Sequence, residues 1–129
     1  MQMTDGSAAG TLGSRALYIG TGPSGRCIAS WRSKVMLPKG KFRFEARART
    51  GSVMPIPGAA TNGAGIRVSG QVRTNYLNGT TGWTTLTHEF DVTAPVKEVE
   101  LIAELRANGG RATFDISSFR IVKVTEPAK

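Results

Sequence analysis

The stretch KFRFEARAR, residues Lys41–Arg49, constrains the fold more than any other part of the sequence. Apolar and charged side chains alternate along it without interruption. A period of two matches a β-strand with one buried and one solvent-facing side, and it does not match a helix. Similar alternation recurs in Gly65–Gly70, Thr84–Val92 and Arg111–Ile116. The sequence therefore predicts several half-buried strands.

The alternation also predicts which side chains face the core. The side chains expected to be buried are Phe42, Phe44, Ile66, Val68, Leu86, Phe90, Leu101, Leu105, Phe114 and Ile116. Trp31, which shares a face with Ala29 and Val35, is expected to join them. The charged side chains expected to face solvent are Arg43, Arg47, Arg67 and Glu100.

Turn-forming residues separate the predicted strands. The 129 residues include 16 glycines and 6 prolines, a distribution typical of an all-β sandwich or barrel. Leu37–Gly40, LPKG, matches a type I turn. The length suits a single domain spanning 1–129, with residues 1–14 expected to be flexible or irregular. Residues 51–65 and 71–82 are expected to be long loops, which often carry binding residues.

The segment Glu98–Ala107 allows two interpretations. Its helix-forming residues and the Asn-Gly-Gly that follows would suit a helix with a glycine end. It also alternates, with Ile102 out of step, and Asn108-Gly109 is a favoured hairpin turn. The alternating strand that follows favours the hairpin.

Composition argues against an enzyme. The chain has one cysteine, Cys27, one histidine, His88, and three aspartates, which is a thin supply for metal or acid–base chemistry. His88 alternates with apolar residues and is expected to be a hydrogen-bonded inner or edge residue. No apolar run approaches the roughly 20 residues that cross a bilayer, so no membrane association is expected. The first residues lack the features of a signal peptide, so we expect either a cytoplasmic chain or a domain of a longer secreted protein.

Four segments carry a resemblance to a known family: ASWRSKVMLPKGKFRFEARART, GAGIRVSG, GWTTLTHEFDV and VELIAELRANGGRATFDISSFRIVKV. They resemble the non-catalytic carbohydrate-binding modules of the galactose-binding-like type. The resemblance implies an antiparallel β-sandwich of jelly-roll topology and a sugar-binding appendage of a larger extracellular or periplasmic protein. The alternative is a structural or protein–protein interaction domain with the same fold but without sugar binding.

The same resemblance suggests a metal site. Asp115 matches the aspartate of the last hairpin that helps to hold a structural calcium ion in such modules. The N-terminal acidic and aromatic partners are missing, apart from Asp5. Because calcium takes six to eight oxygen ligands, we expect a weak site at Asp115 or none, and no other cofactor.

Two places could bind sugar. The outward side chains of the sheet offer Arg47 and Arg67, while the loops offer Asn75, Tyr76 and Trp83. An aromatic ring can lie under the apolar face of a pyranose, and arginine or asparagine can bond to its hydroxyl groups. Tyr76 is the favoured ring because it lies in mid-loop between Asn75 and Asn78, whereas Trp83, at the start of a strand, is expected to pack in the core or at its rim.

Charge suggests that the sugar is acidic. There are 17 Lys and Arg against 9 Asp and Glu, a formal net charge of +8, with +7 within residues 26–49 and −4 within residues 88–104. A basic groove would attract a polyanion, whereas basic and acidic strands could simply pair with each other. Nucleic acid is a weaker candidate because Phe42 and Phe44 point away from the arginines and cannot stack on bases beside them.

Overall fold

The computed structural model describes residues 2–5, 8–11, 16–20, 27–58 and 62–124, and all seven regular elements in this part are antiparallel strands. The strands are β1 (Gln2–Asp5), β2 (Ala8–Thr11), β3 (Ala16–Gly20), β4 (Cys27–Met54), β5 (Gly63–Val68), β6 (Gly79–Ala107) and β7 (Gly109–Lys123). The predicted all-β class is confirmed. The described residues include no helix that could span a membrane.

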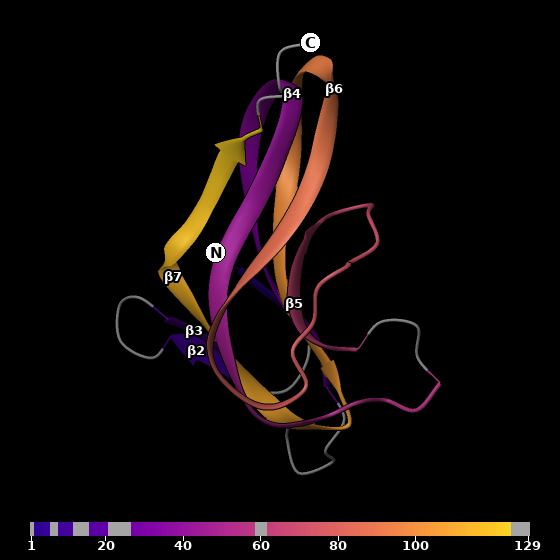
Figure 1. Ribbon diagram of the computed structural model, residues 1–129, viewed down its shortest axis with the longest axis vertical. Coiled ribbons are helices and arrows are strands. Elements are labelled where there is room, and N and C mark those ends of the chain that lie inside the picture. The colour runs from indigo at the N-terminus through magenta and orange to yellow at the C-terminus, as the bar shows by residue number, and fades with distance from the viewer. Residues whose placement is uncertain (1, 6–7, 12–15, 21–26, 59–61, 125–129) are drawn as a thin grey trace.

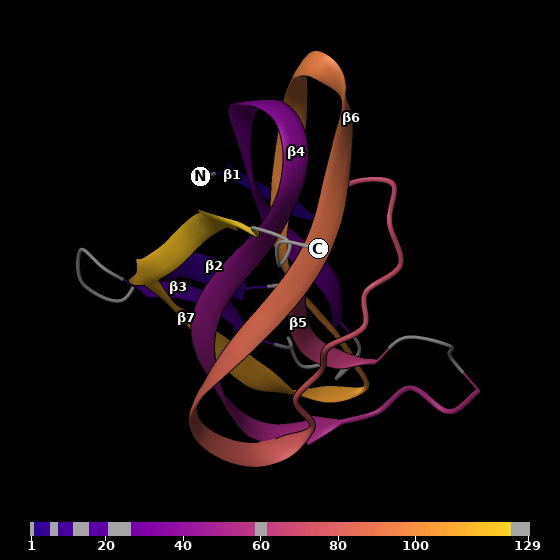
Figure 2. The same ribbon diagram turned by 45° about the horizontal axis from the view of Figure 1, so that its top comes forward.

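Two very long strands organise the molecule. β4 has 28 residues and β6 has 29, and they pair from Cys27↔Ala107 to Val53↔Gly79. Figures 1 and 2 show this two-stranded ribbon bending over at the top of the molecule. The ladder slips there, from Pro38↔Val96 to Gly40↔Val92, and leaves three residues of β6 opposite one residue of β4.

The bend replaces the turn predicted at Leu37–Gly40, and that prediction was wrong. The chain stays in strand β4 through these residues. Pro38 has no amide proton to give to the ladder, and Gly40 has a φ of 155°, which glycine adopts readily. These two residues therefore bend the ribbon without ending the strand.

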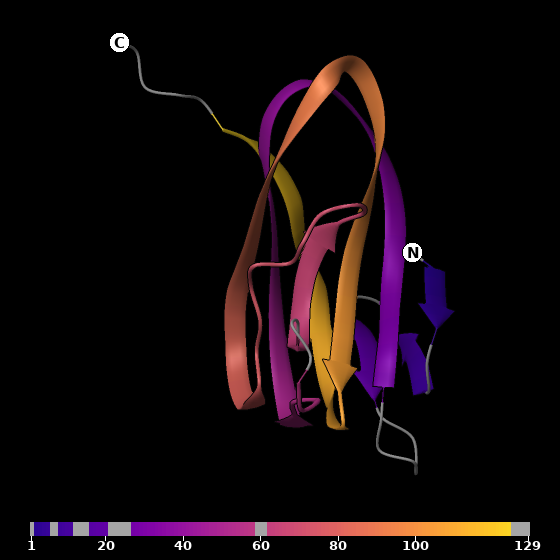
Figure 3. The same cartoon turned by 90° about the vertical axis from the view of Figure 1, so that its right-hand side faces the viewer.

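Folding the ribbon over produces two layers. The first layer contains residues 27–38 of β4 and 96–107 of β6, with β1 and β5 added at its edges. The second layer contains residues 79–92 of β6 and 40–54 of β4, followed by β7, β3 and β2. Figure 3 shows the two limbs of the folded ribbon from the side. The result is the expected β-sandwich.

The core lies between the layers. Nine of the ten side chains predicted to be buried are buried, and Ile116 is partly buried against them. Phe42 and Phe90 stack with ring centroids 5.9 Å apart, and Phe44 meets Phe119 edge to face at 5.8 Å. Trp31 is buried as predicted, and its indole Nε1 donates a hydrogen bond to the Tyr18 carbonyl oxygen at 3.2 Å. This bond ties β4 to β3.

Glu98–Ala107 is strand and not helix, as predicted, because these residues end β6. The predicted hairpin with the next strand was wrong, because β6 pairs with β4 and β5 whereas β7 pairs with β4 and β3, so the chain crosses between the layers at Asn108. Ile102 is fully buried but stands outside the core cluster between the layers, as its break in the alternation indicated. Residues 51–54, 63–65 and 79–82, expected to be loop, belong to β4, β5 and β6. Within the N-terminal segment expected to be irregular, β1 and β2 form short strands that pair with β4 and β3.

Replacing Phe44 with alanine should lower the free energy of unfolding by about 3–5 kcal/mol, because this fully buried ring leaves a cavity. Urea unfolding followed by circular dichroism measures the loss. Val96, which is 60% exposed, provides the control, and Val96→Ala should change stability by no more than about 0.5 kcal/mol. A loss below about 1 kcal/mol for Phe44→Ala would contradict this packing.

Candidate functional site

The residues predicted to bind sugar occupy three separate places. Arg67 lies on the outer face of the first layer. Asn75 and Tyr76 lie in the segment between β5 and β6. Arg47 and Trp83 are brought together on the outer face of the second layer. They do not form one site.

Arg67 belongs to a buried ionic cluster. Its Nε donates to both carboxylate oxygens of Glu104, at 3.3 and 3.2 Å. Arg73, whose side chain is fully buried, donates from Nε to Glu104 at 2.8 Å and from its other nitrogens to the carbonyl oxygens of Asn62, Gly63 and Asn75. Burial lowers the pKa of Arg73, and the Glu104 carboxylate opposes that shift. Arg73 therefore fastens the loops to β6, and Arg67 is engaged by the same Glu104 carboxylate.

The side-chain amide of Asn75 links the two layers at the open edge of the sandwich. Its Oδ1 accepts a hydrogen bond from the Ile66 amide at 2.8 Å, and its Nδ2 donates to the Ile66 and Thr87 carbonyls at 2.9 and 2.8 Å. Ile66 belongs to the first layer and Thr87 to the second, so one amide joins both. Tyr76, next along the chain, is 65% exposed.

Three side chains lie together on the outer face of the second layer, and we call them the platform: Arg47, Arg49 and Trp83. The guanidinium carbons of Arg49 and Arg47 lie 5.0 and 5.6 Å from the centre of the Trp83 ring, within cation–π range. The β4–β6 ladder shifts between Ala48↔Thr84 and Thr50↔Thr81, so Arg49 faces two residues of β6, one of them Trp83. The indole remains 44% exposed.

Two open hollows adjoin the platform. One, of about 320 Å³, is lined by Arg47 together with Glu45, Thr85, Ser117, Ser118 and Arg120. The other, of about 400 Å³, is lined by Arg49 together with Tyr18, Thr50, Gly51, Arg111 and Thr113. Each arginine in contact with Trp83 thus also lines a hollow rich in hydroxyl and guanidinium groups. This combination of an exposed ring and many hydrogen-bonding groups suits a polyhydroxylated ligand.

Asp115 is engaged by the protein itself. Its Oδ2 accepts a hydrogen bond from Arg47 Nη2 at 2.5 Å, and its Oδ1 accepts from the Ser117 amide and hydroxyl at 3.1 and 2.6 Å. The Ser117 and Arg47 hydrogen bonds hold the pKa of Asp115 below its ordinary value. The part of the chain that the structure describes has no cluster of three or more His, Cys, Asp or Glu side chains able to hold a metal. The groups around Asp115 do not fit calcium.

The Glu45 carboxylate, like that of Asp115, accepts hydrogen bonds from neighbouring side chains of the protein. Arg120 and Arg43 each donate from Nε to one of its carboxylate oxygens at 2.6 Å. These hydrogen bonds, first that of Arg120 and then that of Arg43, hold the pKa of Glu45 below its ordinary value. Glu45 and Asp115 are therefore anions that position arginines on this face.

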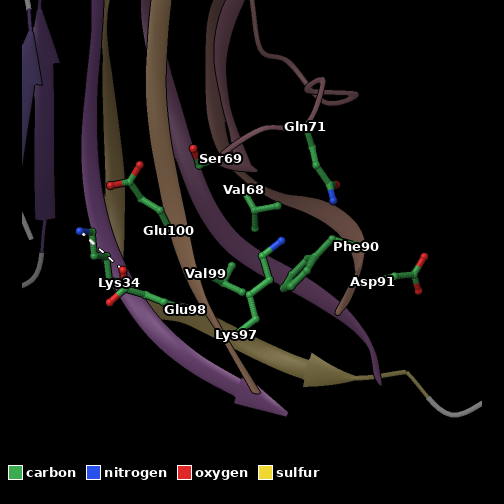
Figure 4. A pocket seen from close by; sticks show the side chains of 10 residues that line it. All are labelled: Lys34, Val68, Ser69, Gln71, Phe90, Asp91, Lys97, Glu98, Val99 and Glu100. Atoms are coloured by element: carbon green, nitrogen blue, oxygen red, sulfur yellow. Dashed lines mark ion pairs between the residues drawn. The ribbon is translucent and has the colours of Figure 1, made fainter. Parts of the chain in front are cut away.

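A further hollow of about 350 Å³ opens between the layers where β5 ends. Figure 4 shows its apolar side chains, Val68, Phe90 and Val99, with the Lys34–Glu98 ion pair of 3.7 Å at its rim. Beside it, His88 Nε2 lies 3.0 Å from Gln71 Oε1, so the buried histidine is hydrogen-bonded as predicted. Burial, and to a smaller degree the charge of Arg67, lowers the pKa of His88.

Comparisons with known proteins agree with the architecture. No protein-family model matches the chain, and no curated protein matches it. Among solved structures, TmCBM61 in complex with β-1,4-galactotriose is 16% identical, with a TM-score of 0.55 over 84% of this chain and 70% of that one. A CBM4 structure is 18% identical, with a TM-score of 0.54 over 93% of this chain and 77% of that one. At this identity the likeness shows the fold, which is the β-sandwich of carbohydrate-binding modules.

Replacing Arg73 with leucine should lower the free energy of unfolding by about 3–5 kcal/mol, because it leaves Glu104 with one partner fewer in a buried place and removes donors from three carbonyl groups. Urea unfolding measures this loss. Lys34→Met breaks the exposed Lys34–Glu98 pair and should cost less than about 1 kcal/mol. Equal losses in the two variants would contradict a structural role for Arg73.

The lowered pKa values of Glu45 and Asp115 predict sensitivity to acid. A carboxyl group whose pKa is lower in the folded state stabilises the protein above the unfolded-state value, near 4, and the stabilisation disappears as the pH falls through the folded-state value. The double variant Glu45→Gln, Asp115→Asn should therefore lose less stability than the parent between pH 5 and pH 2. Thermal melting across that range tests this, and parallel curves for both proteins would refute it.

Proposed function

We propose that the protein is a non-catalytic carbohydrate-binding domain that holds its ligand on the platform. The exposed Trp83 ring, flanked by two arginines on an open sheet face, is the observation that carries the proposal. The fold shared with carbohydrate-binding modules supports it. One of those structures is a complex with β-1,4-galactotriose, which supports a sugar as the class of ligand.

Trp83 supplies the apolar contact in this account. The C–H groups on one side of a pyranose lie against the indole, and the buried aromatic area supplies most of the binding energy. Arg47, Arg49 and the Thr85 hydroxyl bond to the sugar hydroxyls in this account. The Ser117 and Ser118 hydroxyls donate their own protons in hydrogen bonds to Asp115 and contribute to the site only as acceptors. Because a hollow adjoins each arginine, the platform suits several consecutive sugar units of a chain better than a single one.

The acids of this face support binding without cleavage. Glycoside hydrolysis needs a carboxylic acid that keeps its proton near neutral pH, together with a second carboxylate. Glu45 and Asp115 instead accept hydrogen bonds that lower their pKa values, Glu45 from Arg120 and Arg43 and Asp115 from Ser117 and Arg47. A domain of this kind would act as an appendage of a larger extracellular protein and keep that protein close to a polysaccharide.

Isothermal titration with a panel of oligosaccharides, including β-1,4-galactan fragments, tests the proposal. We expect dissociation constants from micromolar to millimolar, because a shallow and wet site gains only a few kcal/mol. Trp83→Ala should weaken binding at least about tenfold, which corresponds to about 1.4 kcal/mol. Tyr76→Ala removes a still more exposed aromatic ring from the loop and should leave binding unchanged.

Two outcomes would contradict the proposal. If Tyr76→Ala abolished binding while Trp83→Ala retained it, the ligand would lie on the loop rather than on the platform. If the parent protein bound no glycan in the panel, the interaction-domain alternative would replace sugar binding.

A further inference from the structure

We propose that the hollow beside Arg49 and Arg111 is a subsite for an anionic substituent of the sugar, a carboxylate or a sulfate. The inference rests on the proposed function and narrows it, because it makes the ligand an acidic polysaccharide. It is carried by the charge distribution on the outer face of the second layer, by the register of β4 and β7, and by two glycines that make room for the lining side chains.

Ion pairs on this face gather toward one end of it. They are Lys41–Glu89, Arg43–Glu45, Arg120–Glu45 and Arg47–Asp115. Arg49 and Arg111 lie beyond them, both exposed, and neither forms an ion pair with any residue that the structure describes. The positive charge of the face is therefore neutralised around residues 41–47 and left unbalanced at the hollow.

Strand register places the two arginines beside each other. Arg49 of β4 lies opposite Thr113 of β7, and Gly51 lies opposite Arg111. Arg49 and Arg111 are thus diagonal neighbours on adjacent strands, a separation that long side chains can span. Thr113 in turn lies opposite Tyr18 of β3, and all of these residues line the same hollow.

Glycines make room for the lining side chains. A Cβ atom on Gly51 would come within 2.5 Å of the Arg111 guanidinium carbon. A Cβ atom on Gly20 would collide with the Tyr18 hydroxyl oxygen. The Arg111 and Tyr18 side chains therefore lie across the strand positions that Gly51 and Gly20 leave open.

This arrangement favours an anion over a neutral hydroxyl group. Two guanidinium groups beside one hollow repel each other, and a bound carboxylate or sulfate relieves that repulsion. Each guanidinium can also donate two parallel hydrogen bonds to such a group, a geometry that lysine does not offer. Arg49 contacts Trp83 as well, so a chain stacked on the indole can bring a charged substituent to the hollow.

A matched pair of ligands tests the inference. Oligogalacturonate and its methyl ester share one backbone and differ only in the charge of the carboxyl group. Isothermal titration at low salt should show at least about tenfold tighter binding of the acid, and 0.5 M NaCl should reduce that preference because it screens charge. A sulfated galactan oligosaccharide forms the third arm, and tighter binding of it than of oligogalacturonate identifies sulfate as the preferred group.

Two matched variants test whether Arg111 causes the preference for the acid over the ester. Arg111→Gln should remove the preference for the acid while leaving binding of the neutral ester within about twofold, because Arg111 does not contact Trp83 in the part of the chain described. Arg120→Gln removes an exposed arginine of the same face that is paired with Glu45, and it should retain the preference. Melting temperatures of both variants confirm that they are folded.

The results separate this inference from the proposed function. Equal binding of acid and ester, still lost in Trp83→Ala, would overturn the anionic subsite and leave sugar binding intact. Absence of binding to every glycan would overturn both. Equally tight, Arg111-dependent binding of a single-stranded DNA oligonucleotide would also overturn it, because the hollow would then recognise phosphate without regard to the sugar.

Discussion

The folded β4–β6 ribbon is the constraint on which the rest of the structure depends. One ladder supplies two strands to each layer, and the bend at Pro38–Gly40 places its two halves face to face. Alternating side chains then bring Phe42 and Phe44 of one half against residues of the other half. The remaining strands add to edges that this ribbon has already defined, β5 and β1 in the first layer and β7 in the second.

The same ribbon creates the candidate site. Each residue that alternation turns away from the core must appear on an outer face, so burying Phe44, Ala46 and Ala48 exposes the arginines between and beside them. The same alternation that places Thr85 on this face, opposite Arg47, places Trp83 there as well. Recruitment of β7 and β3 alongside β4 adds the hydroxyl and guanidinium groups around the ring. The platform is thus a product of core packing as much as of its own residues.

Local patterns predicted the strands and most of the core because the two-residue period reports which side of a strand is buried. They failed at Leu37–Gly40, where tertiary pairing keeps turn-forming residues in a strand. Site prediction was limited for a related reason. Arg67 and Asn75 are the residue types that bind sugars, yet the structure engages both in scaffold contacts with distant residues. No local pattern predicted the buried role of Arg73, because its partner Glu104 lies 31 residues away. The position of Arg111 beside Gly51 depends on the pairing of β7 with β4, which no local pattern predicts.

The two tryptophans offer the most direct test of the central claim. Trp31 is buried between the layers, whereas Trp83 lies on the platform. An ¹H–¹⁵N correlation spectrum resolves their two indole signals, which single substitutions to phenylalanine assign. During titration with a bound oligosaccharide, the account predicts that the Trp83 indole signal shifts progressively while that of Trp31 stays in place. A titration that moved the backbone signals of residues 71–78 and left the Trp83 indole unchanged would contradict it.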